Sequence, residues 1–317
     1  MENQIFAPKP QDSKGPWDVA IIGSGPSGLT ASIYTTRGAA STIIFGGEVW
    51  GGQLMLTTMV DNFPGFPEGI LGPKLMEGMR AQAERFGAEF VGKNVTSIDI
   101  NKKPFEISVG SDVYTSRFII IATGAETLWL DISGISKLIG RGVSSCAPCD
   151  APFFKEKKVA VVGGGDSAME EVDVLTKYAS VVTLIHRRDT FRASAAMQKK
   201  ILDNPKVKVL WNTEVVEVKG EAKLESLSLK NNKTGEISDF PVDGLFVAIG
   251  HKPGSEIFKG AIDTDERGFI RVGEGSTTNI PGVFVAGDVH DHRYKQAVTA
   301  AGFGCMAAMD ALSWLTK

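Results

Sequence analysis

The main hydrophobic pattern in the chain is a short apolar run that meets a glycine-rich turn, and it occurs twice. The first run, Trp17–Ile22, leads into residues 23–28 (GSGPSG). The second run, residues 158–162, leads into residues 163–168 (GGGDSA). Continuous apolar runs of this length are typical of parallel strands that are buried on both faces. Because a helix-compatible sequence follows each turn, the pattern predicts two units of the dinucleotide-binding kind.

Each unit has a second apolar strand that ends in glycine, at residues 118–124 and 245–250. A further strand, which ends at Gly287-Asp288, has no phosphate loop of its own and is expected to complete the first unit. The sequence therefore predicts an α/β protein with two Rossmann-like domains, the second inserted within the first. The expected parts are a loose leader at 1–16, the first part of one domain at 17–125, the inserted domain at 126–251, and the remainder of the first domain at 252–317.

Four other segments have a recognisable pattern. Residues 71–87 carry apolar side chains every three to four positions and end in Gly87, which predicts an amphipathic helix with a glycine cap. The alternating Val, Ile and Thr of residues 91–109 and 207–229 predict antiparallel insertions. The Ala-rich residues 296–315 predict a helix at the end of the chain.

The glycines of the first turn have distinct physical roles. Gly23 permits the tight turn, Gly25 lets a pyrophosphate approach the backbone, and Gly28 permits close packing of helix against strand. The helix that follows adds N–H donors and the positive end of its dipole. Ala168 takes the third place in the second turn, as in the known variant of the pattern. The acidic residue that usually binds a ribose hydroxyl about 20 positions further on is missing from the first unit, so the ribose contact is left unassigned.

Basic residues follow the strand of the second unit. His186, Arg187 and Arg188 end residues 181–188, and Arg192 comes four residues later. Guanidinium groups bind phosphate through a bidentate fork, so this set favours the 2′-phosphate of NADP over NAD, with a solvated basic turn as the alternative. Two dinucleotide sites in one chain predict a tightly held flavin and a diffusible nicotinamide. Asp288 is a candidate acceptor for a hydroxyl of the flavin side chain.

The pair Cys146 and Cys149, with Asp150 directly after it, is the candidate reactive centre. A disulfide across so short a loop stabilises a fold by only about 2 kcal/mol, whereas the CxxC spacing is common in thiol–disulfide exchange. A zinc site would need further cysteine or histidine ligands at matching spacing, and an inert pair is the remaining alternative. Cys305 is expected to be a small buried residue of the last helix.

Composition narrows the class of protein. The chain has 317 residues, of which 43% are hydrophobic and 22% charged, and its net charge is −3. This balance gives no sign of a nucleic-acid-binding surface or of a basic arm for membranes, and no apolar run is long enough to predict a transmembrane span. Three cysteines, and a polar N-terminal segment without the apolar core of a signal peptide, lead us to expect a cytoplasmic protein.

The chain resembles the low-molecular-weight thioredoxin reductases over residues 17–314. The resemblance rests on the two glycine loops and on further segments in the family's order: GGQL at 51–54, DNFPG at 61–65, GRGVSSCAPCD at 140–150, HRRDTFR at 186–192, GDV at 287–289 and YKQAVTAAG at 294–302. It implies FAD and NADPH as cofactors, no metal, and thioredoxin or a thioredoxin-like protein as partner. It also implies a homodimer whose inserted domain rotates between two arrangements.

Roles for individual residues follow from the same resemblance. Cys149 would face the flavin, Cys146 would attack the partner's disulfide, and Asp150 would be the acid and base. The residues implied for FAD are Gly23, Gly25, Pro26, Ser27, Gly28, Gly52, Gln53, Leu54, Asn62, Thr123, Gly124, Gly287, Asp288, Gln296 and Ala297. The residues implied for NADPH are Gly163, Gly165, Asp166, Ser167, Ala168, His186, Arg187, Arg188 and Arg192.

The chain departs from the family pattern at three places. Pro148 stands where the family has threonine, Ala151 where it has glycine, and Lys295 where it often has arginine. Pro148 is the departure that bears on redox potential and partner fit. The flavoprotein of a peroxide-reducing system, a ferredoxin-driven relative and a dithiol oxidase share the same core, and a redox sensor without turnover is the alternative from another class.

Overall fold

The computed structural model describes residues 7–316, which divide into two compact units. Unit 1 comprises Met1–Glu126 and Lys252–Lys317, and unit 2 comprises Thr127–His251. Of the expected leader, residues 1–6 lie outside the described residues. Residues 7–16 contain no helix or strand, but Trp17 Nε1 donates to the Ser13 carbonyl at 3.3 Å and Lys14 pairs with Asp112 at 2.9 Å.

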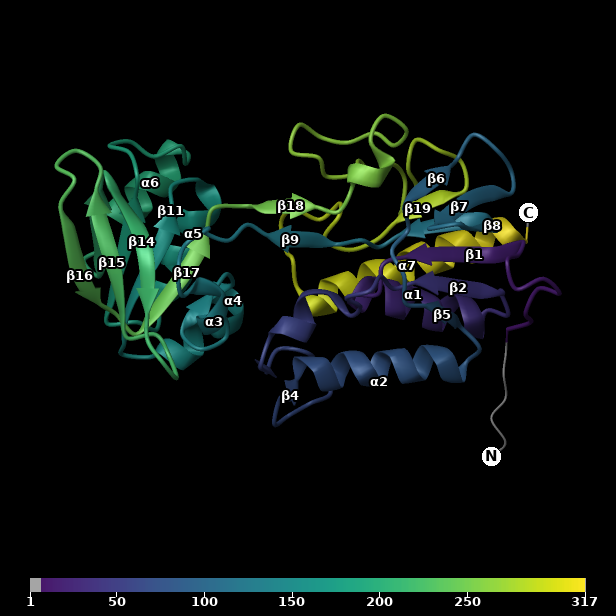
Figure 1. Ribbon diagram of the computed structural model, residues 1–317, viewed down its shortest axis with the longest axis horizontal. Helices are drawn as coiled ribbons and strands as arrows, with labels where there is room; N and C mark the ends of the chain where they lie inside the picture. The colour runs from purple at the N-terminus through teal and green to yellow at the C-terminus, as the bar shows by residue number, and fades with distance from the viewer. Residues whose placement is uncertain (1–6, 317) are drawn as a thin grey trace. The chain divides into compact units, whose positions relative to one another are not determined.

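The sheet of unit 1 has seven strands in the order β5-β2-β1-β8-β7-β6, with β19 also paired to β8 (Figure 1). The strands are β1 (Trp17–Ile22), β2 (Thr42–Phe45), β5 (Glu89–Val91), β6 (Ser97–Asp99), β7 (Phe105–Val109), β8 (Asp112–Ile121) and β19 (Val283–Val285). The β5, β2, β1, β8 and β19 pairings are parallel, and β6 and β7 add antiparallel strands. Because β19 pairs with β8, the last part of the chain completes the sheet that the first part begins.

Helices cover one face of this sheet. They are α1 (Pro26–Arg37), α2 (Gly72–Arg85) and α7 (Ala297–Leu315), accompanied by the short elements η1 (Gly52–Leu56), β3 (Met59–Val60) and β4 (Ile70–Leu71). The short helix η3 (Glu256–Phe258) lies on the opposite face, where Phe258 is buried. Side chains of β8 alternate, so that Phe118 and Ile120 pack under the helices while Ile119 and Ile121 face the opposite core. The predicted helix at 71–87 is confirmed, and Gly87 follows its end with φ +101°.

The predicted helix at 296–315 is confirmed as α7, and Gln296 caps it with a reciprocal pair of hydrogen bonds to Thr299. Small residues on α7 let it pack directly on α1, because a Cβ at Gly304 would lie 2.1 Å from the Ser27 carbonyl oxygen. By length and composition α7 is the one helix in residues 7–316 that could cross a membrane, and 28% of its apolar window is buried in the fold.

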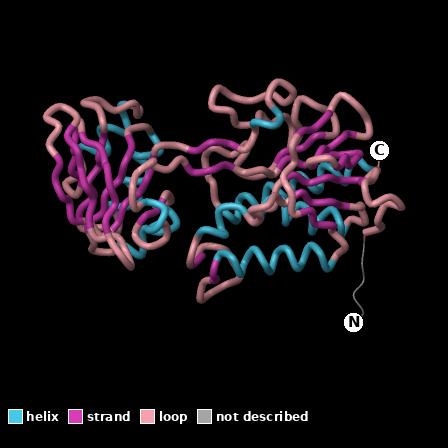
Figure 2. The backbone as a smooth tube through the Cα atoms, viewed as in Figure 1, coloured by secondary structure: helices cyan, strands magenta, loops and turns pink. Residues whose placement is uncertain are grey.

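Unit 2 is a five-stranded parallel sheet in the order β10-β17-β11-β12-β13, with a three-stranded sheet β14-β15-β16 beside it (Figure 2). The strands are β10 (Val143–Ser144), β11 (Lys158–Gly163), β12 (Val181–His186), β13 (Val207–Trp211), β14 (Thr213–Lys219), β15 (Ser226–Asn231), β16 (Ile237–Pro241) and β17 (Gly244–Ala248). The helices are α3 (Ile135–Leu138), α4 (Ala147–Asp150), η2 (Ala151–Phe154), α5 (Asp166–Thr176) and α6 (Ala195–Leu202). The central strand β11 buries Val159 and Val161 under the helices and Ala160 under the antiparallel strands.

The expected α/β fold with two dinucleotide-binding units, one inserted in the other, is confirmed. The chain leaves and re-enters unit 1 through β9 (Ala125–Thr127) and β18 (His251–Pro253), which pair as a two-stranded sheet. The expected antiparallel insertions at 91–109 and 207–229 are wrong at their first residues, which belong to parallel strands. Val207–Trp211 is a parallel edge strand beside β12, and Val91 ends a parallel strand beside β2. Partly buried edge strands alternate apolar and polar residues whether they are parallel or antiparallel, so the pattern alone could not separate the two.

Candidate functional site: two nucleotide loops and a disulfide

The first glycine loop has the backbone geometry that its sequence predicts. Gly23 has φ +111°, and a Cβ there would lie 2.1 Å from the Ala122 carbonyl oxygen. A Cβ at Gly28 would lie 2.1 Å from the Gly23 carbonyl oxygen, so this glycine brings the start of α1 against the strand. A Cβ at Gly25 would meet no heavy atom within 4 Å. The loop is therefore closed on its protein side and open at the N-terminus of α1.

Two buried polar atoms of unit 1 lie without hydrogen-bond partners, both at residues that the resemblance implies for FAD. Thr123 Oγ1 and Asp288 Oδ1 are buried and have no hydrogen-bond partner among the described residues. Burial and the nearby Asp291 carboxylate together raise the pKa of Asp288 to about 7, while Lys295 opposes the effect. Unpaired buried polar atoms are costly in a folded protein, so their presence indicates that a ligand satisfies them. These residues fit a dinucleotide with hydroxyl donors.

Elements from distant parts of the sequence meet at the same loop. A Cβ at Gly52, at the start of η1, would lie 3.4 Å from Gly25 Cα. Ser24 Oγ donates to the Gly46 carbonyl at 2.8 Å and accepts the Gly51 N–H at 2.9 Å. Sequence reasoning missed Ser24, which fixes the approach of η1 to the phosphate loop.

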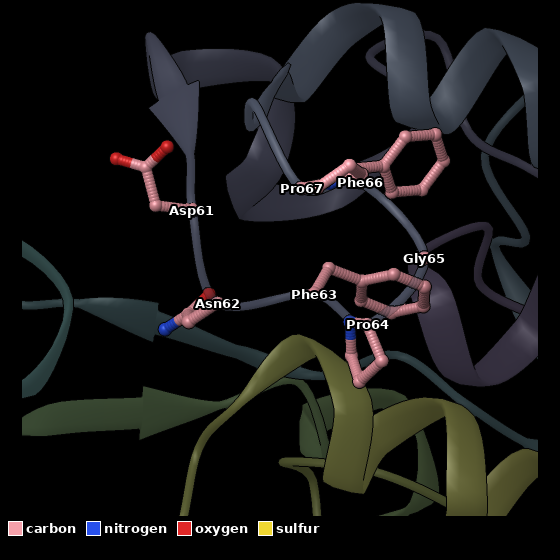
Figure 3. A pocket seen from close by; sticks show the side chains of 7 residues that line it. All are labelled: Asp61, Asn62, Phe63, Pro64, Gly65, Phe66 and Pro67. Carbon is pink, nitrogen blue, oxygen red and sulfur yellow. The ribbon is translucent and has the colours of Figure 1, made fainter.

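Unit 1 also contains a pocket of about 480 Å³ (Figure 3). It is lined by Asp61, Asn62, Phe63, Pro64, Gly65, Phe66 and Pro67. Asn62 Nδ2 donates to Gln296 Oε1 at 3.2 Å, so the structure brings together two residues that the resemblance implies for the flavin. The rings of Phe63 and Phe66 lie 6.4 Å apart and give the pocket an apolar side.

The second glycine loop is packed in a different way at its third position. A Cβ at Gly163 would lie 2.5 Å from Ala168 Cβ, so the alanine fills the space that a glycine leaves in the first loop. A Cβ at Gly165, which precedes α5, would meet no heavy atom within 4 Å. Ser167 and Asp166 are exposed at the start of α5, and Asp166 Oδ1 accepts the N–H and hydroxyl of Ser194, each at 2.9 Å. The open N-terminus of α5 therefore presents N–H donors and the positive end of the helix dipole, an arrangement that suits an anion.

The basic residues beside this loop fall into two groups. Arg187, Arg188 and Arg192 have exposed side chains. His186 is 7% exposed, and its Nδ1 and Nε2 lie 2.8 and 2.9 Å from the carbonyl oxygens of Gly163 and Thr190. The backbone of Arg192 is tied to the glycine loop, because its N–H donates to the Gly164 carbonyl at 2.8 Å. His186 therefore links the second glycine loop to the basic turn that follows β12. The side chains of the three arginines are exposed and can meet a phosphate.

Cys146 and Cys149 form a disulfide in unit 2, with their Cα atoms 5.3 Å apart. The helix α4 spans Ala147–Asp150, and the N–H groups of Cys149 and Asp150 donate to the Cys146 carbonyl at 3.2 and 3.0 Å. Pro148 lies in the first turn of α4, where a helix does not require an N–H. This departure from the family pattern is therefore compatible with the turn that carries the cysteines. The bonded sulfurs argue against a zinc site at this pair.

Asp150 is held beside the disulfide by a buried serine. Ser144 Oγ donates to Asp150 Oδ2 at 2.6 Å and accepts the Cys146 N–H at 3.0 Å. Burial raises the pKa of Asp150, and the hydrogen bond from Ser144 opposes that rise. Glu171, on α5, accepts the Ala147 N–H. Sequence reasoning missed Ser144 and Glu171, because their role depends on how β10 and α5 pack around the CxxC turn.

The expectation that Cys305 is buried was wrong. It lies in α7 as predicted, but it is a free cysteine with intermediate exposure. The face of α7 that packs into unit 1 consists of Ala300, Gly304, Ala307, Ala308 and Ala311, and Cys305 lies beside that face. A hydrogen bond between Tyr34 and Cys305 raises the pKa of Tyr34.

Comparisons with known proteins agree with this set of sites. Residues 17–304 match the family model described as pyridine nucleotide-disulphide oxidoreductase. The thioredoxin reductase of Streptomyces coelicolor is 51% identical over 301 residues, covering 94% of each chain. Thioredoxin reductase 1 of Saccharomyces cerevisiae is 46% identical, covering 94% of this chain and 98% of its own. Among solved structures, the thioredoxin reductase of Giardia duodenalis has a TM-score of 0.91 at 42% identity, covering 95% of this chain and 99% of its own.

Two nucleotide loops and a disulfide in one chain, together with the family match, define the class: the chain belongs to the pyridine nucleotide-disulphide oxidoreductase family. Within that family it groups with the thioredoxin reductases of low molecular weight, which are enzymes that use FAD and NADPH.

Proposed function

We propose that this chain carries electrons from NADPH, through FAD and the Cys146–Cys149 pair, to the disulfide of thioredoxin or a thioredoxin-like protein. The observation that supports this most directly is the disulfide, which joins the two cysteines in the same chain as two open nucleotide loops. Relatives that are 51% and 50% identical to this chain are named thioredoxin reductases, which supports thioredoxin as the partner.

FAD is assigned to unit 1, in the parts 17–125 and 252–317. Gly23, Gly25 and Gly28 leave room for the pyrophosphate at the start of α1, and Asp288 and Thr123 offer buried atoms to its hydroxyl groups. The other residues assigned to FAD are Pro26, Ser27, Gly52, Gln53, Leu54, Asn62, Gly124, Gly287, Gln296 and Ala297. When bound, FAD takes a hydride equivalent from NADPH and makes an electron pair available to a disulfide.

NADPH is assigned to the inserted part, 126–251. Its pyrophosphate would meet the N–H groups at the start of α5, and its 2′-phosphate would meet Arg187, Arg188 and Arg192. Gly163, Gly165, Asp166, Ser167 and Ala168 shape that loop. His186 serves as a positioning residue, because both of its ring nitrogens face backbone carbonyl oxygens.

The cysteines perform the exchange with the partner. Two electrons and two protons convert the Cys146–Cys149 disulfide into a dithiol. The Cys146 thiolate attacks one sulfur of the partner's disulfide, which breaks that bond and releases a thiolate on the partner. Cys149 then attacks the Cys146 sulfur, which restores the disulfide and releases the second partner thiolate. Asp150 gives and takes the protons that these steps need, and burial, which raises its pKa, makes it a better proton holder than an exposed aspartate.

The chain is further proposed to be a cytoplasmic homodimer. Val298, Met306 and Met309 on α7 are 43%, 48% and 56% exposed, which is an unusual exposure for apolar side chains on one helix. A second copy that covers this face would account for them. Analytical ultracentrifugation of the flavin-loaded protein tests this: a dimer is expected, and a monomer at micromolar concentration would overturn it.

Steady-state reduction of a disulfide reporter with thioredoxin tests the proposed function. Wild type should be active with NADPH, much less active with NADH, and inactive when Cys146 is changed to Ser. Cys305→Ser is the matched control and should retain full turnover. If the reaction consumed oxygen at the same rate without thioredoxin, a dithiol oxidase would replace this assignment.

A further inference from the structure

We propose that Ser144 is a positioning residue for the proton transfers at the cysteine pair, because its hydroxyl joins Asp150 and the backbone of Cys146 in one hydrogen-bonded unit. The inference rests on the proposed function, since it presumes that Asp150 is the acid and base of the dithiol reaction.

The position of the Ser144 hydroxyl is fixed by the sheet and not by the CxxC turn itself. Ser144 ends β10, whose register with β17 pairs it with Phe246. The side chain is 8% exposed. A short hydroxyl on a strand has one rotatable bond before its oxygen, so a buried serine here offers a well-defined anchor for the mobile end of Asp150.

The two hydrogen bonds of Ser144 determine which of the atoms donates and which accepts. Ser144 Oγ accepts the Cys146 N–H at 3.0 Å and uses its single hydrogen to reach Asp150 Oδ2 at 2.6 Å. Oδ2 is therefore held as an acceptor, and a proton on the Asp150 carboxyl is directed to Oδ1. The distance of 2.6 Å is typical of a hydroxyl that donates to a carboxylate.

This arrangement matters because Asp150 must alternate between two states. Reduction of the disulfide consumes two electrons and two protons, so the acid must release a proton, and the later attack on the partner returns one to it. The hydrogen bond from Ser144 stabilises the carboxylate, whereas burial favours the protonated form. The two effects oppose each other, so the Ser144 hydroxyl limits the rise in the pKa of Asp150 that burial causes.

Few other charged groups act on Asp150. The elements β10, β17 and η2 contain no ionisable side chain in their sequences. The helix α5 brings Glu171, whose carboxylate is occupied by the Ala147 N–H at the other end of α4. The two cysteines are the remaining titratable groups, once the disulfide is reduced. Removal of the Ser144 hydroxyl should therefore raise the pKa of Asp150, and a pH profile of the reaction can detect that change.

The experiment measures kcat/KM for thioredoxin against pH for the flavin-loaded enzyme and four variants. Asp150→Asn identifies the limb of the profile that belongs to Asp150. Ser144→Ala should move that limb to higher pH and lower the plateau about tenfold, because the carboxylate loses its donor and its orientation. Ser144→Thr, which keeps a hydroxyl, should restore both. Ser145→Ala is the matched control, because that hydroxyl pairs with Thr127 at 3.2 Å and should leave the profile unchanged.

A double mutant separates positioning from a general loss of structure. In the Asp150→Asn background, Ser144→Ala should change the rate by less than about twofold, because its effect acts through Asp150. A Ser144→Ala variant with a wild-type profile would overturn the inference, and so would an equal loss of rate in both backgrounds. If Asp150→Asn were itself fully active, the acid and base assignment in the proposed function would fail instead.

Discussion

The carboxyl group of Asp288 offers a test of the flavin site that can be worked out in magnitude. Its Oδ1 is buried without a partner, and burial raises its pKa from 3.8 to about 7. A pKa that is raised in the folded state means that the folded apoprotein holds this proton more tightly than the unfolded chain does. The contribution of Asp288 to stability is therefore full below about pH 4 and is lost as pH rises through about 7. The full loss corresponds to about 4 kcal/mol as an upper bound.

The substitution Asp288→Asn removes this titration while keeping the size of the side chain. Between about pH 5 and about pH 8, the melting temperature of the wild-type apoprotein should fall relative to the variant, by up to about 10 °C. FAD should reverse the difference, because a hydroxyl that donates to the carboxylate stabilises the charged form. The stabilisation of wild type by FAD should therefore grow with pH, while that of Asp288→Asn stays constant.

The assay is thermal unfolding of apoprotein and flavin-loaded protein, followed by circular dichroism across this pH range. The two apoproteins are compared by the slope of melting temperature against pH, so that a constant offset from the new amide does not matter. Equal slopes for wild type and variant would refute the reasoning about burial. Equal stabilisation of both by FAD at every pH would refute the assigned contact.

Substitutions at four further positions test the assigned sites. Gly25→Ala should leave the melting temperature of the apoprotein unchanged and weaken FAD binding at least about tenfold. Gly28→Ala should also destabilise the apoprotein by about 1–3 kcal/mol, because its Cβ would meet a carbonyl oxygen. Flavin retention and melting curves distinguish the two variants. Arg192→Gln should raise KM for NADPH about tenfold or more and leave KM for NADH unchanged, and equal effects on both would remove the 2′-phosphate assignment. Cys305→Ser should leave turnover unchanged, and a loss of activity measured with thioredoxin would assign that thiol a role in catalysis.

The sequence was most informative where backbone sterics select the residue. Gly23, Gly28 and Ala168 each occupy a position whose available space the structure explains atom by atom. The apolar runs that precede them could be recognised as buried parallel strands because residues 19–22 and 159–162 are continuously apolar. The nested order of the two units could also be predicted, because the strand before Asp288 has no glycine loop that could begin a third unit.

The sequence was least informative where a residue's role depends on the neighbours that the fold supplies. The alternation in 207–211 predicts a strand but not whether its partner runs parallel to it. Burial of His186 depends on the rings of Phe191 and Trp211, which lie 5.1 and 6.1 Å from it and come from other segments. The hydrogen bond of Ser144 to Asp150 spans six residues and arises only when β10 and α4 are in place.

The most direct test of the account is an anaerobic titration of the flavin-loaded protein with NADPH, followed by the visible absorbance of the flavin. Wild type should take up about two electron pairs per chain, one for FAD and one for the Cys146–Cys149 disulfide, and Cys149→Ser should take up about one. If wild type and Cys149→Ser took up the same number, the disulfide would not receive electrons from the flavin, and the central claim would be contradicted.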